Sequence, residues 1–172
     1  NATRGAGIYN DGGSLTLTAN TRIRCNIAQG SNSPVVGGGG GIYNLNGDLT
    51  LTDVILDQNE TVSTAPDGNG GGIYADLQSG GSLRLTRAVV DNNDASAANG
   101  GGIYLSKVLS SSVASIVDST LSSNQATNGG GLYIQRGRVD ISGSSIVQNA
   151  ADSLGGGGNG TPSGKVEGKQ EQ

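Results

Sequence analysis

The residues of this chain that could do chemistry are carboxylates and arginines that recur at two fixed distances before an asparagine. The first distance, six residues, gives Asp53, Arg87 and Asp118, and the second, two residues, gives Arg24, Asp57 and Asp91. Carboxylate clusters with arginine or calcium serve the enzymes that cleave polysaccharides. Opposite charges at equivalent positions of neighbouring strands are more simply explained as cross-strand ion pairs.

These charge columns favour ion pairing over catalysis. Arginine or serine interrupts each pair of carboxylates, and the chain has no histidine. The single cysteine, Cys25, has no disulfide partner within the chain, and we expect it to fill a core or edge position. We therefore predict no catalytic residue, no cofactor and no metal ion. The alternative is a carbohydrate-binding or carbohydrate-active protein, similar to a polysaccharide lyase or hydrolase, in which Asp57 and Asp91 take part.

All the tyrosines of the chain follow one recurring motif, a glycine run and an aliphatic residue, as in GGGIYN (39–44) and GGGIYA (70–75). If the aliphatic residue points into the molecule, the next residue points outward. The sequence thus predicts an exposed ladder of stacked rings, formed by Tyr9, Tyr43, Tyr74, Tyr104 and Tyr133. Such a ladder either stabilises the strands or offers a flat track for a glycan or a partner protein.

The motif is part of a repeat that covers most of the chain. Its aliphatic residue recurs as Ile8, Ile42, Ile73, Ile103 and Leu132, at spacings of 34, 31, 30 and 29 residues. An asparagine recurs in the same unit as Asn26, Asn59, Asn93, Asn124 and Asn149. Between these two marks lies a segment of alternating residues, such as SLTLT (14–18), DLTLT (48–52) and SLRLT (82–86). Alternation with period two indicates a strand that buries one face.

Short strands at constant spacing, joined by connections whose length varies from repeat to repeat, indicate a solenoid. We predict an all-β, right-handed parallel β-helix of about five coils, each with three short strands, over residues 1–151. Residues 152–172 are expected to be a glycine-rich polar tail or an incomplete last coil. The inward positions are expected to be the aliphatic residues after glycine, the alternating pairs and the aliphatic residue three before each asparagine.

Both polar motifs have structural interpretations. The glycines stand where a connection enters the first strand, where a Cβ would crowd the next coil and several φ angles are expected to be positive. The asparagines Asn26, Asn59, Asn93, Asn124 and Asn149 are expected to bond to backbone groups at a bend and to one another, which forms a ladder.

The repeat resembles that of the polymorphic outer-membrane proteins, in which a GGxI motif precedes an aromatic-x-x-Asn motif. GGGI or GGGL matches at 39–42, 70–73, 100–103 and 129–132, and GAGI at 5–8. Where that family prefers phenylalanine three residues before asparagine, this chain has aliphatic residues such as Leu56 and Val90. The resemblance implies a bacterial cell-surface or extracellular β-helix, and it does not imply a catalytic residue.

The remaining expectations concern partners. A formal net charge of -4 without a basic run gives no support for nucleic-acid binding, and no apolar run is long enough to span a bilayer. The loops 29–38, 62–69, 96–99 and 127–128 shorten along the chain and are expected to form a tapering ridge for binding. Coil ends without capping helices predict either a longer parent protein or head-to-tail self-association into a filament. The non-enzymatic interpretation is thus a structural or adhesive surface β-helix.

Overall fold

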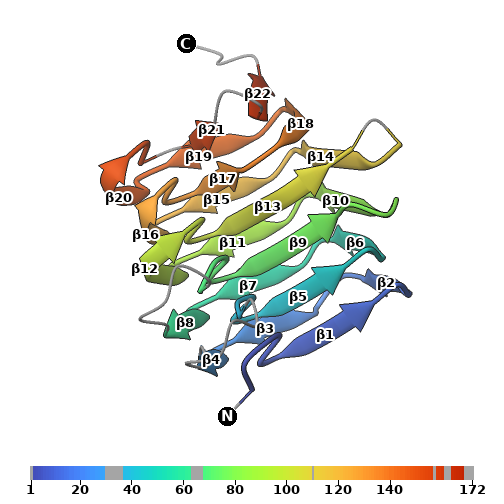
Figure 1. Ribbon diagram of the computed structural model, residues 1–172, viewed down its shortest axis with the longest axis horizontal. Helices are drawn as coiled ribbons and strands as arrows, with labels where there is room; N and C mark the ends of the chain where they lie inside the picture. Colours follow the sequence, from blue (N-terminus) through green and yellow to red (C-terminus); the bar gives the residue numbers. More distant parts are fainter. Residues whose placement is uncertain are drawn as a thin grey trace.

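The computed structural model describes residues 2–29, 37–62, 68–109, 111–156, 158–160 and 164–168. These residues form short strands that stack, coil upon coil, from the N-terminal end of the molecule to the C-terminal end (Figure 1). Every pairing between named strands is parallel, and equivalent strands of successive coils lie side by side in four sheets. The fold is the predicted parallel β-helix.

The strands of the first two sheets carry the glycine motif and the alternating segment. The first sheet contains β1 (Ile8–Asp11), β5 (Ile42–Leu45), β9 (Ile73–Leu77), β13 (Ile103–Val108), β17 (Leu132–Ile134) and β21 (Gly158–Gly160). The second sheet contains β2 (Ser14–Leu17), β6 (Asp48–Thr52), β10 (Ser82–Thr86), β14 (Val113–Val117), β18 (Gly137–Ser142) and β22 (Gly164–Gly168).

The other two sheets flank the recurring asparagine. The third sheet contains β3 (Arg22–Arg24), β7 (Ile55–Asp57), β11 (Val89–Asp91), β15 (Thr120–Ser122) and β19 (Ser145–Val147). The fourth sheet contains β4 (Ile27–Gln29), β8 (Glu60–Val62), β12 (Asp94–Asn99), β16 (Gln125–Asn128) and β20 (Ala150–Leu154). The chain thus completes four turns between β1 and β17 and continues through β20 into β21 and β22, close to the predicted number of coils.

The prediction of three strands per coil was wrong, because each described coil from β1 to β20 has four. The chain bends at the residue before each asparagine, which has a left-handed backbone with φ of 57° at Gln58 and 52° at Asn92. A further strand follows the bend, since the residue two positions after the asparagine turns inward again. Ala28, Ala95 and Ala126 are buried there. This column recurs in the sequence, but it is not among the inward positions expected from the sequence pattern.

The core has the predicted composition. Cα partners in the first sheet run Ile8, Ile42, Ile73, Ile103 and Leu132, and all of them pack into one hydrophobic cluster. Ile42, Ile73 and Ile103 are fully buried, whereas Ile8 in the first coil is only partly buried. Full burial of one such side chain is worth roughly 1.5–3 kcal/mol, so the middle coils carry the greater share of the apolar stabilisation.

Beyond residue 151 the chain stays with the stack. β20 runs on to Leu154, β21 pairs with β17, and β22 pairs with β18. The described part of the C-terminal segment therefore adds strands to the first two sheets. No helix long and apolar enough to cross a membrane occurs among the described residues.

Candidate functional site

The recurring asparagines form a continuous hydrogen-bonded ladder along the molecule. Each donates from Nδ2 to Oδ1 of the asparagine in the next coil, over 2.9, 2.9, 3.0 and 2.9 Å, in the order Asn26, Asn59, Asn93, Asn124 and Asn149. The second Nδ2 proton of Asn93 reaches the backbone oxygen of Leu56, 3.1 Å away. Asn59 and Asn124 are fully buried. The ladder is therefore internal and holds neighbouring coils in register.

The glycine motif packs against this ladder. A Cβ on Gly72 would lie 3.2 Å from Cγ of Asn93 and 2.6 Å from the backbone oxygen of Gly102 in the next coil. Gly41 and Asn59 stand in the same relation, as do Gly102 and Asn124. The glycine run and the asparagine are thus two halves of one packing arrangement, because the space that a side chain would need is filled by carboxamides and backbone.

A second asparagine ladder was missed in the sequence. Asn99 donates from Nδ2 to Oδ1 of Asn69 over 2.9 Å, and Asn128 donates in the same way to Asn99 over 2.7 Å. Each of these residues directly precedes a glycine run, so the recurring tetrapeptide NGGG at 69–72, 99–102 and 128–131 was the available signal. The donors of this ladder point toward the N-terminal end, opposite to those of the first ladder.

The tyrosine rings stack as predicted, but their predicted exposure was wrong at three positions. Successive rings lie 5.4, 4.5, 5.2 and 5.3 Å apart between centroids, in the order Tyr9, Tyr43, Tyr74, Tyr104 and Tyr133. Tyr43, Tyr74 and Tyr104 keep only 3–5% of their surface exposed, whereas Tyr9 keeps 46%. The reason is the stacking itself, since a ring with neighbours on both sides loses both faces to them.

Other side chains also contact the tyrosine ladder. The guanidinium of Arg4 lies 5.5 Å from the ring centroid of Tyr43, and Leu45 packs against the same cluster. Burial raises the pKa of Tyr74, although its side-chain hydrogen bond with Ser106 opposes the shift. Burial also raises the pKa of Tyr43. The stacked faces of the central rings are thus occupied by other rings, which leaves no continuous flat track for a ligand.

The first charge column contains the ion pair that the spacing suggested. Arg87 donates from Nε to Oδ1 of Asp53 over 2.7 Å and from Nη2 to Oδ2 over 2.8 Å. Both residues, and Asp118 beyond them, have a left-handed backbone with φ of 49–56°. They lie at the corner between the second and third sheets. The hydrogen bonds from Arg87 lower the pKa of the Asp53 carboxyl.

The second column is organised by an arginine that the spacing did not single out. Arg22 donates to both carboxylate oxygens of Asp57, over 2.7 and 2.6 Å, and these bonds lower the pKa of Asp57. Nε of Arg24, the predicted member, lies 3.8 Å from the same carboxylate. Asp91 is the Cα partner of Asp57 and accepts a hydrogen bond of 2.7 Å from Ser122. The missed signal was Arg22 itself, two residues before Arg24 on the same face of β3.

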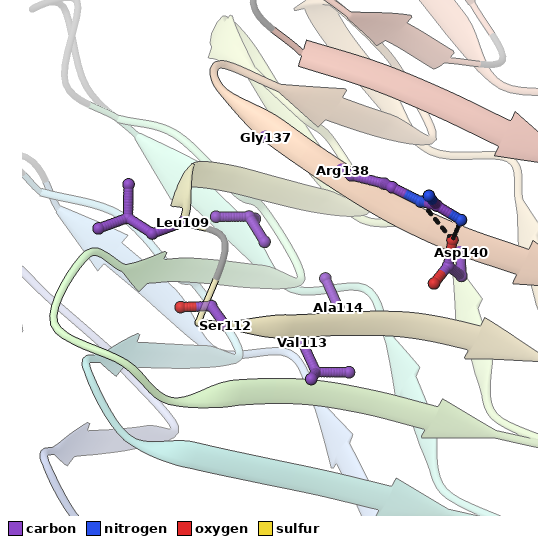
Figure 2. Close-up of a pocket in the computed structure, with 8 residues that line it drawn as sticks. Leu109, Ser112, Val113, Ala114, Gly137, Arg138 and Asp140 are labelled. Atoms are coloured by element: carbon purple, nitrogen blue, oxygen red, sulfur yellow. Dashed lines mark hydrogen bonds and ion pairs between the residues drawn. The ribbon is translucent and has the colours of Figure 1, made fainter.

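A hollow opens beside the connection between β13 and β14 (Figure 2). It has a volume of about 390 Å³ and is lined by Val108, Leu109, Ser112, Val113, Ala114 and Gly137. The ion pair of Arg138 and Asp140 on β18 completes the lining on the other side (Figure 2). We call this feature the β13–β18 hollow. No motif in the sequence predicts it, because it arises from a difference in length between two neighbouring coils.

The expected loop ridge is only partly described. In this ridge, positions 30–36 and 63–67 lie outside the described residues, whereas 96–99 belong to β12 and 127–128 to β16.

Cys25 is exposed, and its Sγ lies 3.4 Å from Oε1 of Gln58. It therefore does not occupy the core. In the described ranges, no group of three or more His, Cys, Asp or Glu side chains is placed to hold a metal ion.

No family model matches the chain, and neither the curated proteins nor the solved structures include a significant match.

Proposed function

We propose that this chain is a non-enzymatic structural or adhesive β-helix of the bacterial cell surface or extracellular space. The observation that carries the proposal is that matched columns join the coils: an asparagine ladder, a tyrosine stack and an aliphatic core along the molecule, and a second asparagine ladder through Asn69, Asn99 and Asn128. Within the described residues, no buried side-chain nitrogen or oxygen lacks a hydrogen-bond partner. A rod that repeats the same satisfied contacts in every coil suits a stiff spacer that holds other groups away from a surface.

The surface location rests on the resemblance of the GGGI and asparagine motifs to those of the polymorphic outer-membrane proteins. The test is to detect the chain on intact cells of its source organism with an antibody and to compare the signal with that of lysed cells. Equal signals support the proposal. A signal that appears only after lysis contradicts the location.

The carbohydrate-active alternative depends on one observation, the register of Asp57 with Asp91 in the third sheet. Most enzymes that cleave glycosidic bonds use a pair of carboxyl groups, and two carboxylates on neighbouring strands could supply that pair. Arg22 holds Asp57 in a bidentate ion pair, which favours a structural role for that carboxylate. The decisive assay is turnover of neutral and acidic polysaccharides by the protein and by Asp57→Asn and Asp91→Asn. Turnover that these substitutions abolish would overturn the non-enzymatic proposal.

Self-association is part of the same proposal. The first-coil side chains Ile8, Leu15 and Leu17 belong to the core but are only partly buried. We propose that further coils cover them, supplied either by a longer parent chain or by a second copy stacked head to tail. Light scattering on the complete product of the gene separates these arrangements, since stacking makes the apparent mass rise with concentration. A product of only these residues that stays monomeric at high concentration contradicts both.

A further inference from the structure

The β13–β18 hollow results from a step in the length of one corner. Between β13 and β14 the chain takes four residues, 109–112, whereas between β17 and β18 it takes two, Gln135 and Arg136. Hydrogen bonds from Gln135 N to Leu105 O (2.8 Å) and from Val108 N to Arg136 O (2.9 Å) tie the shorter corner to β13. The shorter corner cannot cover the longer one, and the uncovered part is the hollow.

One wall of the hollow is aliphatic and partly open to solvent. Leu109 is 39% exposed and Val113 is 40% exposed, while Val108 behind them is buried. Gly137 of one coil lies directly against Val108 of the other. Its φ is 109°, and a Cβ there would lie only 2.1 Å from the backbone oxygen of Val108. The space beside the aliphatic wall thus depends on a residue without a side chain.

The opposite wall is polar and carries an ion pair. Arg138 donates from Nε to Oδ1 of Asp140 over 2.7 Å, and its Nη2 lies 2.6 Å from the same oxygen. Oδ2 of Asp140 has no hydrogen-bond donor among the described residues, and Figure 2 shows it directed away from the ion pair. Both side chains are more than 60% exposed. The wall therefore offers a carboxylate acceptor beside a guanidinium.

We propose that the β13–β18 hollow binds one ring of a neutral saccharide. Its volume of about 390 Å³ lies at the lower end of the range of small-molecule sites, about 300–1,000 Å³. The C–H face of a sugar ring packs on Val113 and Leu109. Adjacent hydroxyls donate to Oδ2 of Asp140 and accept from the guanidinium of Arg138, since a carboxylate only accepts and a guanidinium only donates.

The ion pair favours this class of ligand over charged sugars. A uronate that pairs with Arg138, or an ammonium that pairs with Asp140, would compete with the existing ion pair, whereas neutral hydroxyls leave it intact. A purely aliphatic group would cover the aliphatic wall but would strip water from the ion pair without replacing its hydrogen bonds. A neutral ring with hydroxyls on one edge satisfies both walls. The inference goes beyond the proposed scaffold function, because a scaffold does not need to bind a ligand.

The test is an NMR titration of the whole chain with methyl glycosides of neutral hexoses and with neutral di- and trisaccharides at millimolar concentration. The expected result is saturating shifts of the Leu109 and Val113 methyl signals. Asp140→Asn is expected to weaken binding by about tenfold, as the loss of a charge-assisted hydrogen bond does, and Arg138→Gln by a similar factor. Asp53→Asn, which breaks an exposed ion pair at another corner, is the matched control and should leave the affinity unchanged.

Three results would overturn the proposal. The first is the absence of binding for every neutral sugar in the set. The second is tighter binding of glucuronate or glucosamine than of the neutral hexoses. The third is that cyclohexanol binds as tightly as the neutral hexoses and that Asp140→Asn does not change its affinity. The hollow would then be a binding site for an aliphatic side chain of a partner protein. Each variant is checked for unchanged thermal unfolding first, so that a lost shift reports on binding. None of these outcomes bears on the scaffold function, which is tested by cell-surface detection.

Discussion

Gly72 and Asn93 lie against each other inside one coil, so close that a Cβ on the glycine would crowd the Asn93 carboxamide at 3.2 Å. The carboxamide of Asn93 occupies that space and uses it to bond with Asn59 on one side and Asn124 on the other. The two signature motifs of the repeat therefore depend on each other. The glycine makes room for the ladder, and the ladder fills the space that the glycine leaves.

Replacing Gly72 with alanine should destabilise the fold by about 1–3 kcal/mol, because the new methyl group overlaps both the Asn93 carboxamide and the backbone of the next coil. The free energy of unfolding in urea measures the effect. Gly12→Ala is the comparison without crowding. Gly12 has no atom within 4 Å of the place that a methyl group would take, but unlike Gly72 it has a left-handed φ of 69°. It should show only the backbone strain of a left-handed residue, about 1–2 kcal/mol. A Gly72→Ala chain as stable as its parent would contradict the packing argument.

Replacing Asn93 with alanine should be among the most damaging single changes in the chain. It removes the acceptor of two bonds from Asn59 and the donor to Leu56 O, and it leaves these buried groups unsatisfied. Each unsatisfied buried group costs about 1–3 kcal/mol, so a total loss of about 3–5 kcal/mol is expected in the same urea experiment. Asn149→Ala, at the last rung of the ladder, is the comparison and should lose less. Equal losses at the two rungs would mean that burial does not set the cost.

The buried phenols predict a loss of stability in alkali. The pKa of Tyr74 is raised in the folded chain, so between the ordinary tyrosine value near 10 and its folded value the unfolded chain has lost a proton that the folded chain keeps. Fewer protons bound in the unfolded state make the free energy of unfolding fall as the pH rises, and below about pH 10 the effect is absent. Thermal melts at increasing alkaline pH measure the slope. Tyr74→Phe should flatten it, and an unchanged slope in that variant would contradict the assignment to Tyr74.

The ion pair of Arg22 and Asp57 predicts a loss of stability in acid. Because the pKa of Asp57 is lowered in the folded state, the pair stabilises the fold above the ordinary aspartate pKa of 3.8 and ceases to do so as the pH falls through the folded value. Asp57→Asn should therefore be less stable than the parent chain at neutral pH, by about 1–2 kcal/mol, and equal to it in strong acid. Comparing urea unfolding at the two pH values gives the difference. A gap between the proteins that persists unchanged in acid would refute the role of the charge.

The periodic columns of the sequence were sufficient to predict the parallel β-helix, the aliphatic core and the asparagine ladder. In a solenoid, each residue contacts its own equivalents in the neighbouring coils, so a repeat in the sequence states those contacts directly. Ile42, Ile73 and Ile103 are an example, since they are aligned in the sequence and are also Cα partners in the first sheet. The stacking order of the tyrosines follows in the same way.

Contacts between different columns depended on the folded molecule. The Gly72–Asn93 packing and the choice of Arg22 rather than Arg24 as the closer partner of Asp57 both join positions that no repeat aligns. Burial of Tyr74 needed the closeness of the stacked rings, which alternation of inward and outward residues does not encode. The β13–β18 hollow depended on two corners of unequal length meeting in space. A periodic sequence specifies what lies above and below each residue, whereas the path of the chain around the coil decides what lies across from it.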